Sequence, residues 1–246
     1  MATAMGIITA TANKVPGPRS AIAFHDERAS QWSAGYHASP HFTRRARDWE
    51  AALRDHLVPQ ARLLDVGCGS GDLSVIAARL GAIPTCIDGS PAMVAEARKA
   101  FAAVSPEARF FAADVAALPV ADGEYDIAIA SSLLEYLDPL APALAEIRRA
   151  IRPGGLFLCT VPNPRSLYRR LEGQALRLTG RPAYRRFVNP DIYRRDIAGD
   201  LRRAGFEPLE SRLLGLPPRI PNGMLAGIAE RHPLLATMTL IVSRAV

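Results

Sequence analysis

The sequence has few lysines and few cysteines. Of its 30 basic residues, only Lys14 and Lys99 are lysines. The three cysteines, Cys68, Cys86 and Cys159, are odd in number, which predicts free thiols and a reducing compartment, the cytoplasm, in place of a disulfide framework. No Cys/His spacing is typical of a metal site, so we predict that the chain binds no metal.

The sequence also has no long apolar run. None reaches the roughly 18 residues that a membrane-spanning helix needs, so no transmembrane segment is predicted. Residues 1–14 are small and apolar, but no basic residue precedes their apolar part, which argues against a secretory signal. Because Pro16-Gly17-Pro18 follows, we predict a disordered leader over residues 1–20. Residues 21–246 are long enough for one globular domain, and an apolar content of 49% is ordinary for one.

Arginine supplies almost all of the positive charge, and the net charge is +6. Arginine pairs concentrate in the second half of the chain, at Arg169-Arg170, Arg185-Arg186, Arg194-Arg195 and Arg202-Arg203. Three interpretations stay open: solvated helix faces, a site for an anionic substrate, or contact with nucleic acid or an anionic membrane surface. No RNA-binding module or basic strip interleaved with aromatics is visible, so nucleic acid is not the expected partner.

A glycine-rich segment is the most informative positive feature. Leu63 to Val66 is an apolar run that includes Asp65, and it predicts a buried parallel strand. Three glycines follow at every second position: Gly67, Gly69 and Gly71. Glycine permits unusual dihedrals and lets a ligand approach the backbone, and the next residues, 72–80, have helical periodicity. Ligands of open α/β sheets bind at such strand ends, although glycines that serve only the turn are the alternative.

A second apolar run, Ala82 to Asp88, also ends in an acid. Asp88 lies about 20 residues past the glycine turn, where an acid accepts hydrogen bonds from a ribose in mononucleotide-binding folds. A plain loop aspartate is the alternative. Ser90-Pro91 then predicts a helix start, with serine as N-cap and proline at the first helical position, and Met93 lies in the first turn.

Three more strands are predicted further along the chain. Ala108 to Ala112 leads to Asp114, and Ile127 to Ala130 follows a turn. The segment Ile151-Arg152-Pro153-Gly154-Gly155 combines a helix stop with a tight turn and leads into the apolar strand Leu156 to Val161.

These segments lie in order between residues 61 and 161, and together they resemble the motifs of class I S-adenosylmethionine-dependent methyltransferases. The small-molecule enzymes of quinone biosynthesis look nearest. The resemblance implies an α/β fold: a Rossmann-like, mostly parallel seven-stranded sheet with helices on both faces and an antiparallel edge strand. Thr237 to Ser243 suits that edge strand, and Glu207 to Leu214 suits the strand before it, after a helix over Asp191 to Ala204.

The same resemblance implies how S-adenosylmethionine would bind. The glycine turn, with Asp65 at its floor, would lie against the methionine part and the ribose. Asp88 would bind the ribose hydroxyls, Asp114 with Val115 would frame the adenine, and Ser131 would lie near the sulfonium.

An arginine of the first helix is also expected near the cofactor carboxylate. Arg47 matches by its distance from the glycine turn, and Arg44 and Arg45 are its rivals. The implied cofactor-binding set is Arg47, Asp65, Gly67, Gly69, Gly71, Asp88, Gly89, Met93, Asp114, Val115 and Ser131.

The catalytic base is less well defined. Many relatives carry histidine after the glutamate of the segment Leu134-Glu135-Tyr136, where this chain has Tyr136, a poor base at neutral pH. His37 and His41, in the expected lid segment Trp32 to Phe42, are alternatives. We expect a catalytic role for His37 or Tyr136, and transfer by orientation alone stays open.

The resemblance divides the domain into four parts. Residues 21–56 are expected to form N-terminal lid helices and 57–161 the cofactor-binding core, while 162–190 and 215–235 are expected to be insertions that cover the substrate.

The expected function is methyl transfer from S-adenosylmethionine to a small anionic or aromatic molecule, most readily to an oxygen of a phenolic, quinone-like or other natural product. An RNA or protein methyltransferase and a non-catalytic S-adenosylmethionine-binding protein are the alternatives. A nicotinamide-dependent oxidoreductase is disfavoured, because G-x-G-x-G is not the dinucleotide spacing. The acceptor and the oligomeric state stay open.

Overall fold

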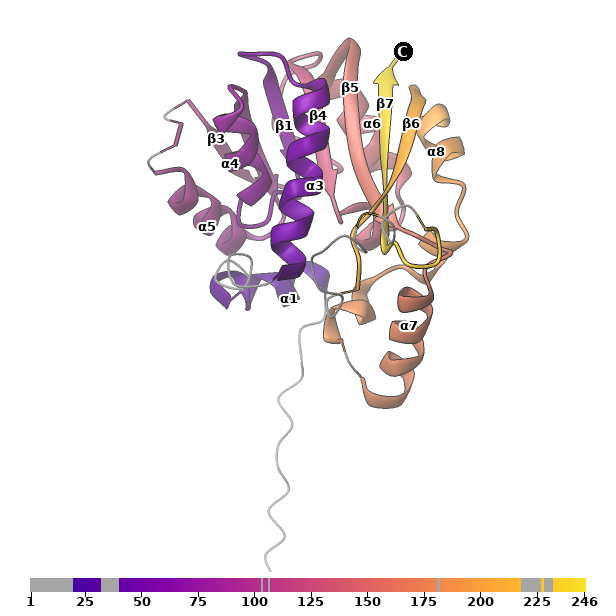
Figure 1. The fold of residues 1–246 in the computed structure, drawn as a ribbon. Helices are drawn as coiled ribbons and strands as arrows, with labels where there is room; N and C mark the ends of the chain where they lie inside the picture. Colours follow the sequence, from indigo (N-terminus) through magenta and orange to yellow (C-terminus); the bar gives the residue numbers. More distant parts are fainter. Residues whose placement is uncertain are drawn as a thin grey trace, which may run out of the picture.

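A seven-stranded sheet forms the centre of the molecule (Figure 1). The structure is a computed structural model that describes residues 20–31, 40–102, 104–105, 107–180, 182–217, 227 and 232–246. The strands are β1 (Arg62–Val66), β2 (Ile83–Asp88), β3 (Arg109–Ala112), β4 (Tyr125–Ser131), β5 (Ile151–Pro162), β6 (Phe206–Leu214) and β7 (Met238–Ala245). Their order, β3-β2-β1-β4-β5-β7-β6, confirms the expected mostly parallel α/β fold. Apart from Ser20, the expected leader lies outside the described residues.

The antiparallel strand is β7, and it lies one place in from the edge. It pairs antiparallel with β5 on one side and with β6 on the other, so β6 is the edge strand. The burial of the two strands agrees with this order. Four consecutive residues of β7, 240–243, are buried, as in an interior strand, whereas exposed and partly buried residues alternate along most of β6.

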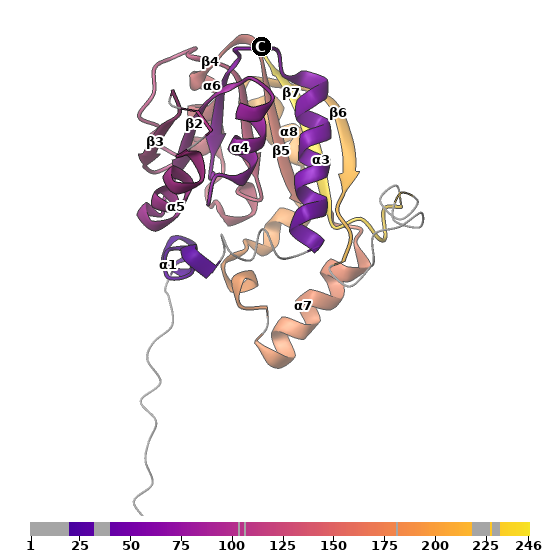
Figure 2. The ribbon, with the colours of Figure 1, turned by 60° about the vertical axis from the view of Figure 1, so that its left-hand side comes forward.

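Helices cover both faces of the sheet (Figures 1 and 2). They are α3 (Pro40–His56), α4 (Asp72–Arg79) and α5 (Pro91–Phe101) on one face and α6 (Ala141–Ala150) and α8 (Ile197–Arg203) on the other. The spacing of Trp49, Ala52 and Leu53 gives α3 one apolar face, and these residues join α4 and the sheet in a buried cluster. Leu144 of α6 and Leu201 of α8 belong to the cluster beneath the opposite face.

Two expected boundaries differ from the structure. The fifth strand begins at Ile151 and not at Leu156. Tyr125 of β4 pairs with Ile151, and Ile127 pairs with Leu156. The proline–glycine segment between these two pairs forms a bulge in β5. The helix expected over residues 191–204 is two elements, a 3-10 helix η3 (Pro190–Tyr193) and α8. The first ends at Tyr193, and Asp196 caps the second by accepting a hydrogen bond from the backbone N–H of Gly199 at 3.0 Å.

Two further helices lie at the carboxyl ends of the parallel strands: α1 (Ala21–Asp26) and α7 (Leu167–Thr179) (Figures 1 and 2). Asp26 connects α1 to the start of α5 by two hydrogen bonds. Its Oδ1 accepts one from the Ser90 hydroxyl at 2.6 Å and one from the Ala92 N–H at 3.1 Å. Among the described residues of the expected lid segment 21–56, α1 lies at these strand ends, whereas α3 packs along the sheet face.

Candidate functional site

A cavity of about 660 Å³ opens at the carboxyl ends of β1, β2 and β4. Its walls also include side chains from α1, α3 and α7. This volume is in the range of roughly 300–1,000 Å³ that small-molecule sites occupy. The position agrees with the rule that open α/β sheets bind ligands at the carboxyl ends of their strands.

The three glycines of the turn have different roles. All have positive φ: 72° at Gly67, 53° at Gly69 and 80° at Gly71. A Cβ on Gly69 would meet nothing within 4 Å, so its backbone is open to a ligand, whereas a Cβ on Gly67 would lie 2.9 Å from Leu133 Cδ1. A Cβ on Gly71 would lie 3.0 Å from that of Ala97. Gly71 does not line the cavity, and it lies where α4 packs closely against Ala97 of α5.

Asp88 lies at the end of β2 with its carboxylate held by the backbone. Its Oδ2 accepts from the N–H of Gly69 at 2.9 Å, and its Oδ1 accepts from the N–H of Ser90 at 2.8 Å. Burial raises the pKa of Asp88, and the two hydrogen bonds oppose that rise. Each carboxylate oxygen has a second lone pair, so this geometry leaves capacity to accept from ribose hydroxyls.

Asp65 lies at the floor of the turn and is almost completely buried. Its Oδ2 accepts from the Ser74 hydroxyl at 2.6 Å. Burial raises the pKa of Asp65 to about 7, against the lowering effect of the Ser74 hydrogen bond. A bound cation beside this carboxylate would favour its ionised form.

Four more residues of the expected cofactor-binding set line the cavity: Gly89, Met93, Asp114 and Val115. Asp114 is exposed, and its Oδ1 accepts from the Ala116 N–H at 2.9 Å, which orients the carboxylate at the rim. A Cβ on Gly89 would lie 2.9 Å from Ile22 Cδ1, so this glycine lets α1 approach the site.

The arginine that enters the cavity is Arg45 and not Arg47. Nη2 of Arg45 donates to Oγ of Ser131 at 2.6 Å, and both residues line the cavity. Arg47 is exposed and does not line it. Residues two apart on a helix point about 200° apart, so α3 can turn only one of the two toward the site.

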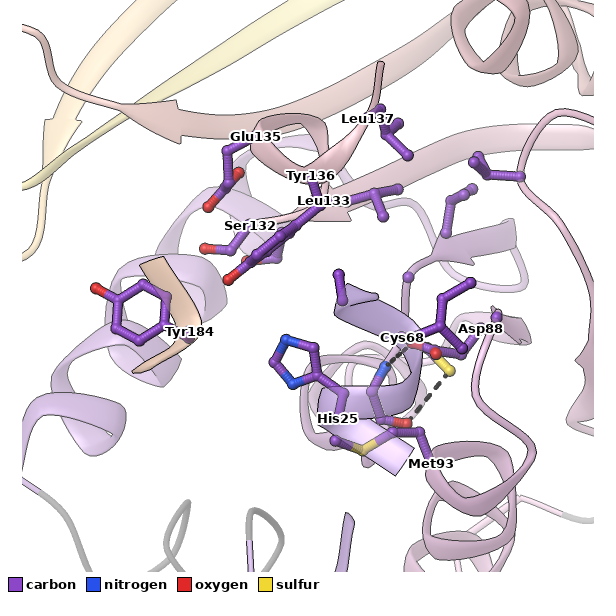
Figure 3. A pocket seen from close by; sticks show the side chains of 18 of the residues that line it. His25, Cys68, Asp88, Met93, Ser132, Leu133, Glu135, Tyr136, Leu137 and Tyr184 are labelled. Carbon is purple, nitrogen blue, oxygen red and sulfur yellow. Dashed lines mark hydrogen bonds between the residues drawn. The ribbon is translucent and has the colours of Figure 1, made fainter. Parts of the chain in front are cut away.

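Tyr136 lies in the 3-10 helix η1 (Leu134–Tyr136) after β4, at the other end of the cavity from Asp88 and Met93 (Figure 3). Burial raises the pKa of Tyr136 further above its ordinary value. Its phenol therefore stays protonated and can donate a hydrogen bond, which counts against the base role considered for it. The positive φ of Ser132, 54°, marks a strained turn just before η1.

Of the histidines weighed as bases, His37 lies outside the described residues, and the side chain of His41 is not described either. The histidine that lines the cavity is His25 of α1, whose ring centroid lies 5.7 Å from that of Tyr136. Burial lowers the pKa of His25, and Arg28 lowers it further, so the imidazole is neutral at pH 7. No motif around His25 pointed to this position, because it results from the docking of α1.

A buried ionic cluster forms the wall beside α7. Arg169 Nη1 donates to Glu172 Oε2 at 3.0 Å and to the Tyr184 hydroxyl at 2.9 Å. Arg185 Nη1 donates to the same carboxylate oxygen at 3.0 Å. These three charged side chains are 5–14% exposed. For Arg169 and Arg185, the interpretation as solvated helix faces is therefore wrong.

Two features are absent from the described residues. Within the residues that the structure describes, no three His, Cys, Asp or Glu side chains are grouped to hold a metal ion. No helix of this part of the chain combines the length and the apolar character needed to cross a membrane.

The donor and acceptor groups of the cavity fit S-adenosylmethionine. Gly69 leaves room where a Cβ would project, Asp88 offers carboxylate lone pairs, and Arg45 places a guanidinium at the end of β4. The backbone at Gly69 would lie against the methionine part of the cofactor, Asp88 would bind its ribose, and Arg45 would bind its carboxylate.

The comparisons with known proteins agree with this fit. A family model described as a methyltransferase domain matches residues 64–159. The malonyl-[acyl-carrier protein] O-methyltransferase of Enterobacter lignolyticus (strain SCF1) is 36% identical over 100 residues, which are 41% of this chain and 38% of that protein. The ubiquinone biosynthesis O-methyltransferase of Cereibacter sphaeroides (strain ATCC 17029 / ATH 2.4.9) is 29% identical over 158 residues, 61% of this chain and 62% of that protein. The chain thus matches less than two thirds of the length of either relative.

Solved structures share the fold at lower identity. The methyltransferase in the complex with the Haloferax volcanii Trm112 activator has a TM-score of 0.67 and 21% identity, covering 90% of this chain and 97% of that one. The geranyl diphosphate C-methyltransferase of Streptomyces coelicolor A3(2), solved with Mg²⁺, geranyl diphosphate and S-adenosyl-L-homocysteine, has a TM-score of 0.60 and 19% identity, covering 81% and 79%.

Proposed function

Because residues 64–159 form a methyltransferase domain of the class I S-adenosylmethionine-dependent family, we propose that this chain methylates a small molecule, at an oxygen of a phenolic or quinone-like compound. The observation that carries the proposal is a single cavity that joins the glycine turn and Asp88 to a wall of aromatic side chains. A cofactor and a flat acceptor would meet inside it.

The cofactor would be held by side chains already oriented by the protein. Asp88 would accept from the ribose hydroxyls, Asp114 from the adenine amino group, and Arg45 would face the carboxylate. When bound, the cofactor supplies a methyl group activated by the sulfonium charge. The chain must then hold the acceptor in line with it, and orientation alone contributes up to roughly 7–11 kcal/mol in intramolecular analogues.

The acceptor would lie at the end formed by Tyr136, Tyr168 and Tyr184, next to Arg169. Aromatic side chains favour stacking on a phenolic or quinone ring. The two relatives named above carry O-methyltransferase names, which supports oxygen as the methylated atom. A macromolecular acceptor, RNA or protein, is the second hypothesis, and the position of α1 and α7 over the strand ends favours the small one.

Calorimetric titration with S-adenosylhomocysteine tests the cofactor half of the proposal. We expect binding to the wild type and much weaker binding to Asp88→Ala, while Asp122→Ala, an exposed carboxylate outside the cavity, serves as the matched control. NADH should not bind. Tight NADH binding, or none by S-adenosylhomocysteine, would refute the proposal.

A screen with isotope-labelled S-adenosylmethionine tests the acceptor half. We expect label in catechols, hydroxybenzoates or quinols. Label that enters RNA or protein and no phenolic compound would replace the small-molecule hypothesis by the second one.

A further inference from the structure

Glu135 is a carboxylate of the cavity wall that the proposed cofactor contacts do not use. It belongs to η1 and is 4% exposed. Its Oε2 is buried and has no hydrogen-bond partner in the described part of the chain. A buried charged oxygen without a partner costs free energy, and native proteins rarely keep one. A partner brought by a bound molecule would account for it.

The other carboxylates of the cavity wall are occupied by the protein itself. Both oxygens of Asp88 accept backbone N–H groups, and Asp65 accepts from a serine hydroxyl. Glu172 accepts from Arg169 and Arg185. Glu135 differs from the other carboxylates of the cavity wall in one respect: among the described residues, it has an oxygen that is both buried and without a hydrogen-bond partner.

The surroundings of Glu135 act on its charge in both directions. Burial raises the pKa of Glu135, while Arg169, Arg45 and a hydrogen bond with Ser132 lower it. The titratable and charged groups that face it come from α3, η1, β5, α7 and η3: Arg45, Tyr136, Cys159, Arg169 and Tyr193. A carboxylate whose pKa is raised is, in its ionised form, a stronger base than an ordinary glutamate.

The position of Glu135 places it with the acceptor. Figure 3 shows its carboxylate near Tyr136 and Tyr184, at the opposite end from Asp88 and Met93. The adenosine would occupy the Asp88 end, and Glu135 lines the end with Tyr136 and Tyr184 that the proposed function assigns to the acceptor.

We propose that Glu135 is the general base of the reaction and that the acceptor is a neutral hydroxyl compound of the phenol class. This inference rests on the proposed function. The acceptor oxygen uses a lone pair to bond to the methyl carbon, and the bond from that carbon to sulfur breaks with its electron pair left on sulfur. The hydroxyl proton passes to Oε2 of Glu135, which later returns it to solvent.

The same carboxylate excludes one class of acceptor. A carboxylate acceptor has no proton to give at neutral pH, and it would place a second negative charge against Glu135 in a water-poor site. The structure thus assigns phenols in preference to carboxylic acids.

The first step of the test separates this inference from the proposed function. S-adenosylhomocysteine is titrated into the wild type, Glu135→Gln and Glu207→Gln. The last is the matched control, because Glu207 is an exposed glutamate of β6 outside the cavity. We expect equal binding to all three. If the wild type does not bind, the proposed function fails and this inference fails with it.

The second step measures whether a bound phenol has lost its proton. The three proteins, saturated with S-adenosylhomocysteine, are titrated with 4-nitrophenol at a pH below the pKa of the free probe, because phenol and phenolate absorb at different wavelengths. We expect a phenolate band in the wild type and in Glu207→Gln, and a phenolate-to-phenol ratio at least about tenfold lower in Glu135→Gln. Benzoate should bind the wild type more weakly than the phenol, and Glu135→Gln should bind it more tightly than the wild type does.

Several results would overturn the inference while the cofactor step succeeds. These are a phenolate band unchanged in Glu135→Gln, no binding of 4-nitrophenol to the wild-type complex, and tighter binding of benzoate than of the phenol. A loss of the band in His25→Gln and not in Glu135→Gln would assign the base to the neutral imidazole of α1.

Discussion

The protonation of Asp65, at the floor of the cofactor site, makes the stability of the folded protein depend on pH. Its pKa rises from 3.8 to about 7 in the folded protein, so between these values the folded state keeps a proton that the unfolded state has lost. Its contribution to stability is complete below pH 4 and is lost as the pH rises to about 7. A pKa difference of about three corresponds to on the order of 4 kcal/mol.

We therefore expect Asp65→Asn to flatten the fall in the free energy of unfolding between pH 4 and 7, because an amide does not ionise and can still accept from Ser74. Urea denaturation at a series of pH values measures this. Asp122→Asn, at an exposed carboxylate, is expected to leave the profile unchanged. Parallel profiles for wild type and Asp65→Asn would show that Asp65 is ionised in the folded protein.

Substitutions at Gly69 and Gly71 distinguish two functions of the glycine turn: leaving the backbone open to a ligand at Gly69, and close packing against Ala97 at Gly71. Both have positive φ, so alanine strains either by roughly 1–2 kcal/mol. Only at Gly71 would the new Cβ also press on Ala97, which adds roughly 1–3 kcal/mol of overpacking.

We expect Gly71→Ala to lower the free energy of unfolding more than Gly69→Ala does. Gly69→Ala should instead weaken S-adenosylhomocysteine binding at least tenfold, because its Cβ enters the cavity. Urea denaturation of both variants measures the difference in stability, and calorimetry measures the difference in S-adenosylhomocysteine binding. Equal binding by Gly69→Ala and the wild type would show that the ligand does not approach the backbone of Gly69.

At the scale of elements, α1 closes one side of the cavity and is attached through Asp26. Loss of its two hydrogen bonds to Ser90 and Ala92 costs roughly 1–2 kcal/mol. We expect Asp26→Ala to weaken S-adenosylhomocysteine binding up to about tenfold and to speed hydrogen exchange over residues 20–31.

Asp196→Ala is the matched control for this element. Asp196 also accepts from a backbone N–H at a helix start, but it caps α8, and it does not line the cavity. It should cost about 1 kcal/mol of stability and leave binding unchanged. Weaker binding in Asp196→Ala would mean that general destabilisation, and not release of α1, controls affinity.

The elements that could be predicted are those whose signal is local. The run around Asp65, the acid at Asp88 and the serine–proline helix start each depend on neighbouring residues, and β1, β2 and α5 lie where these signals indicate. The place of β7 between β5 and β6 depends on pairing between distant strands, which no local pattern records. Likewise, nothing around His25 indicates that α1 docks on α5 and carries it into the cavity.

Choosing between Arg45 and Arg47 shows the same limit within one helix. By their distance in sequence from the glycine segment, Arg45 and Arg47 are both candidates to reach the cofactor carboxylate. Which of them faces the cavity depends on the rotation of α3 about its axis, and the packing of Trp49 and Leu53 on the sheet determines that rotation. A role for Glu135 could not be predicted from the sequence for a different reason. Its burial and its unpartnered oxygen are properties of the assembled cavity and not of the segment around it.

At the scale of the whole molecule, the cluster of Arg169, Glu172 and Arg185 joins the segment that contains α7 to the sheet. Arg169 also donates through Nε to the carbonyl of Thr237 at 3.3 Å, directly before β7. One carboxylate lies between two guanidinium groups that are 14% and 11% exposed. Bulk salt screens such buried charges weakly.

Removal of Glu172 would leave two buried cations facing each other. We expect Glu172→Ala to lower the free energy of unfolding by roughly 3–5 kcal/mol, as for other broken buried pairs. The double variant Glu172→Ala/Arg185→Met should recover part of this loss, because it removes one of the unbalanced charges and keeps an apolar stem. Urea denaturation of the four proteins of this cycle gives the coupling energy. A coupling near zero, or a loss that disappears in high salt, would mean that the cluster is exposed in solution and does not attach α7 to the strand ends.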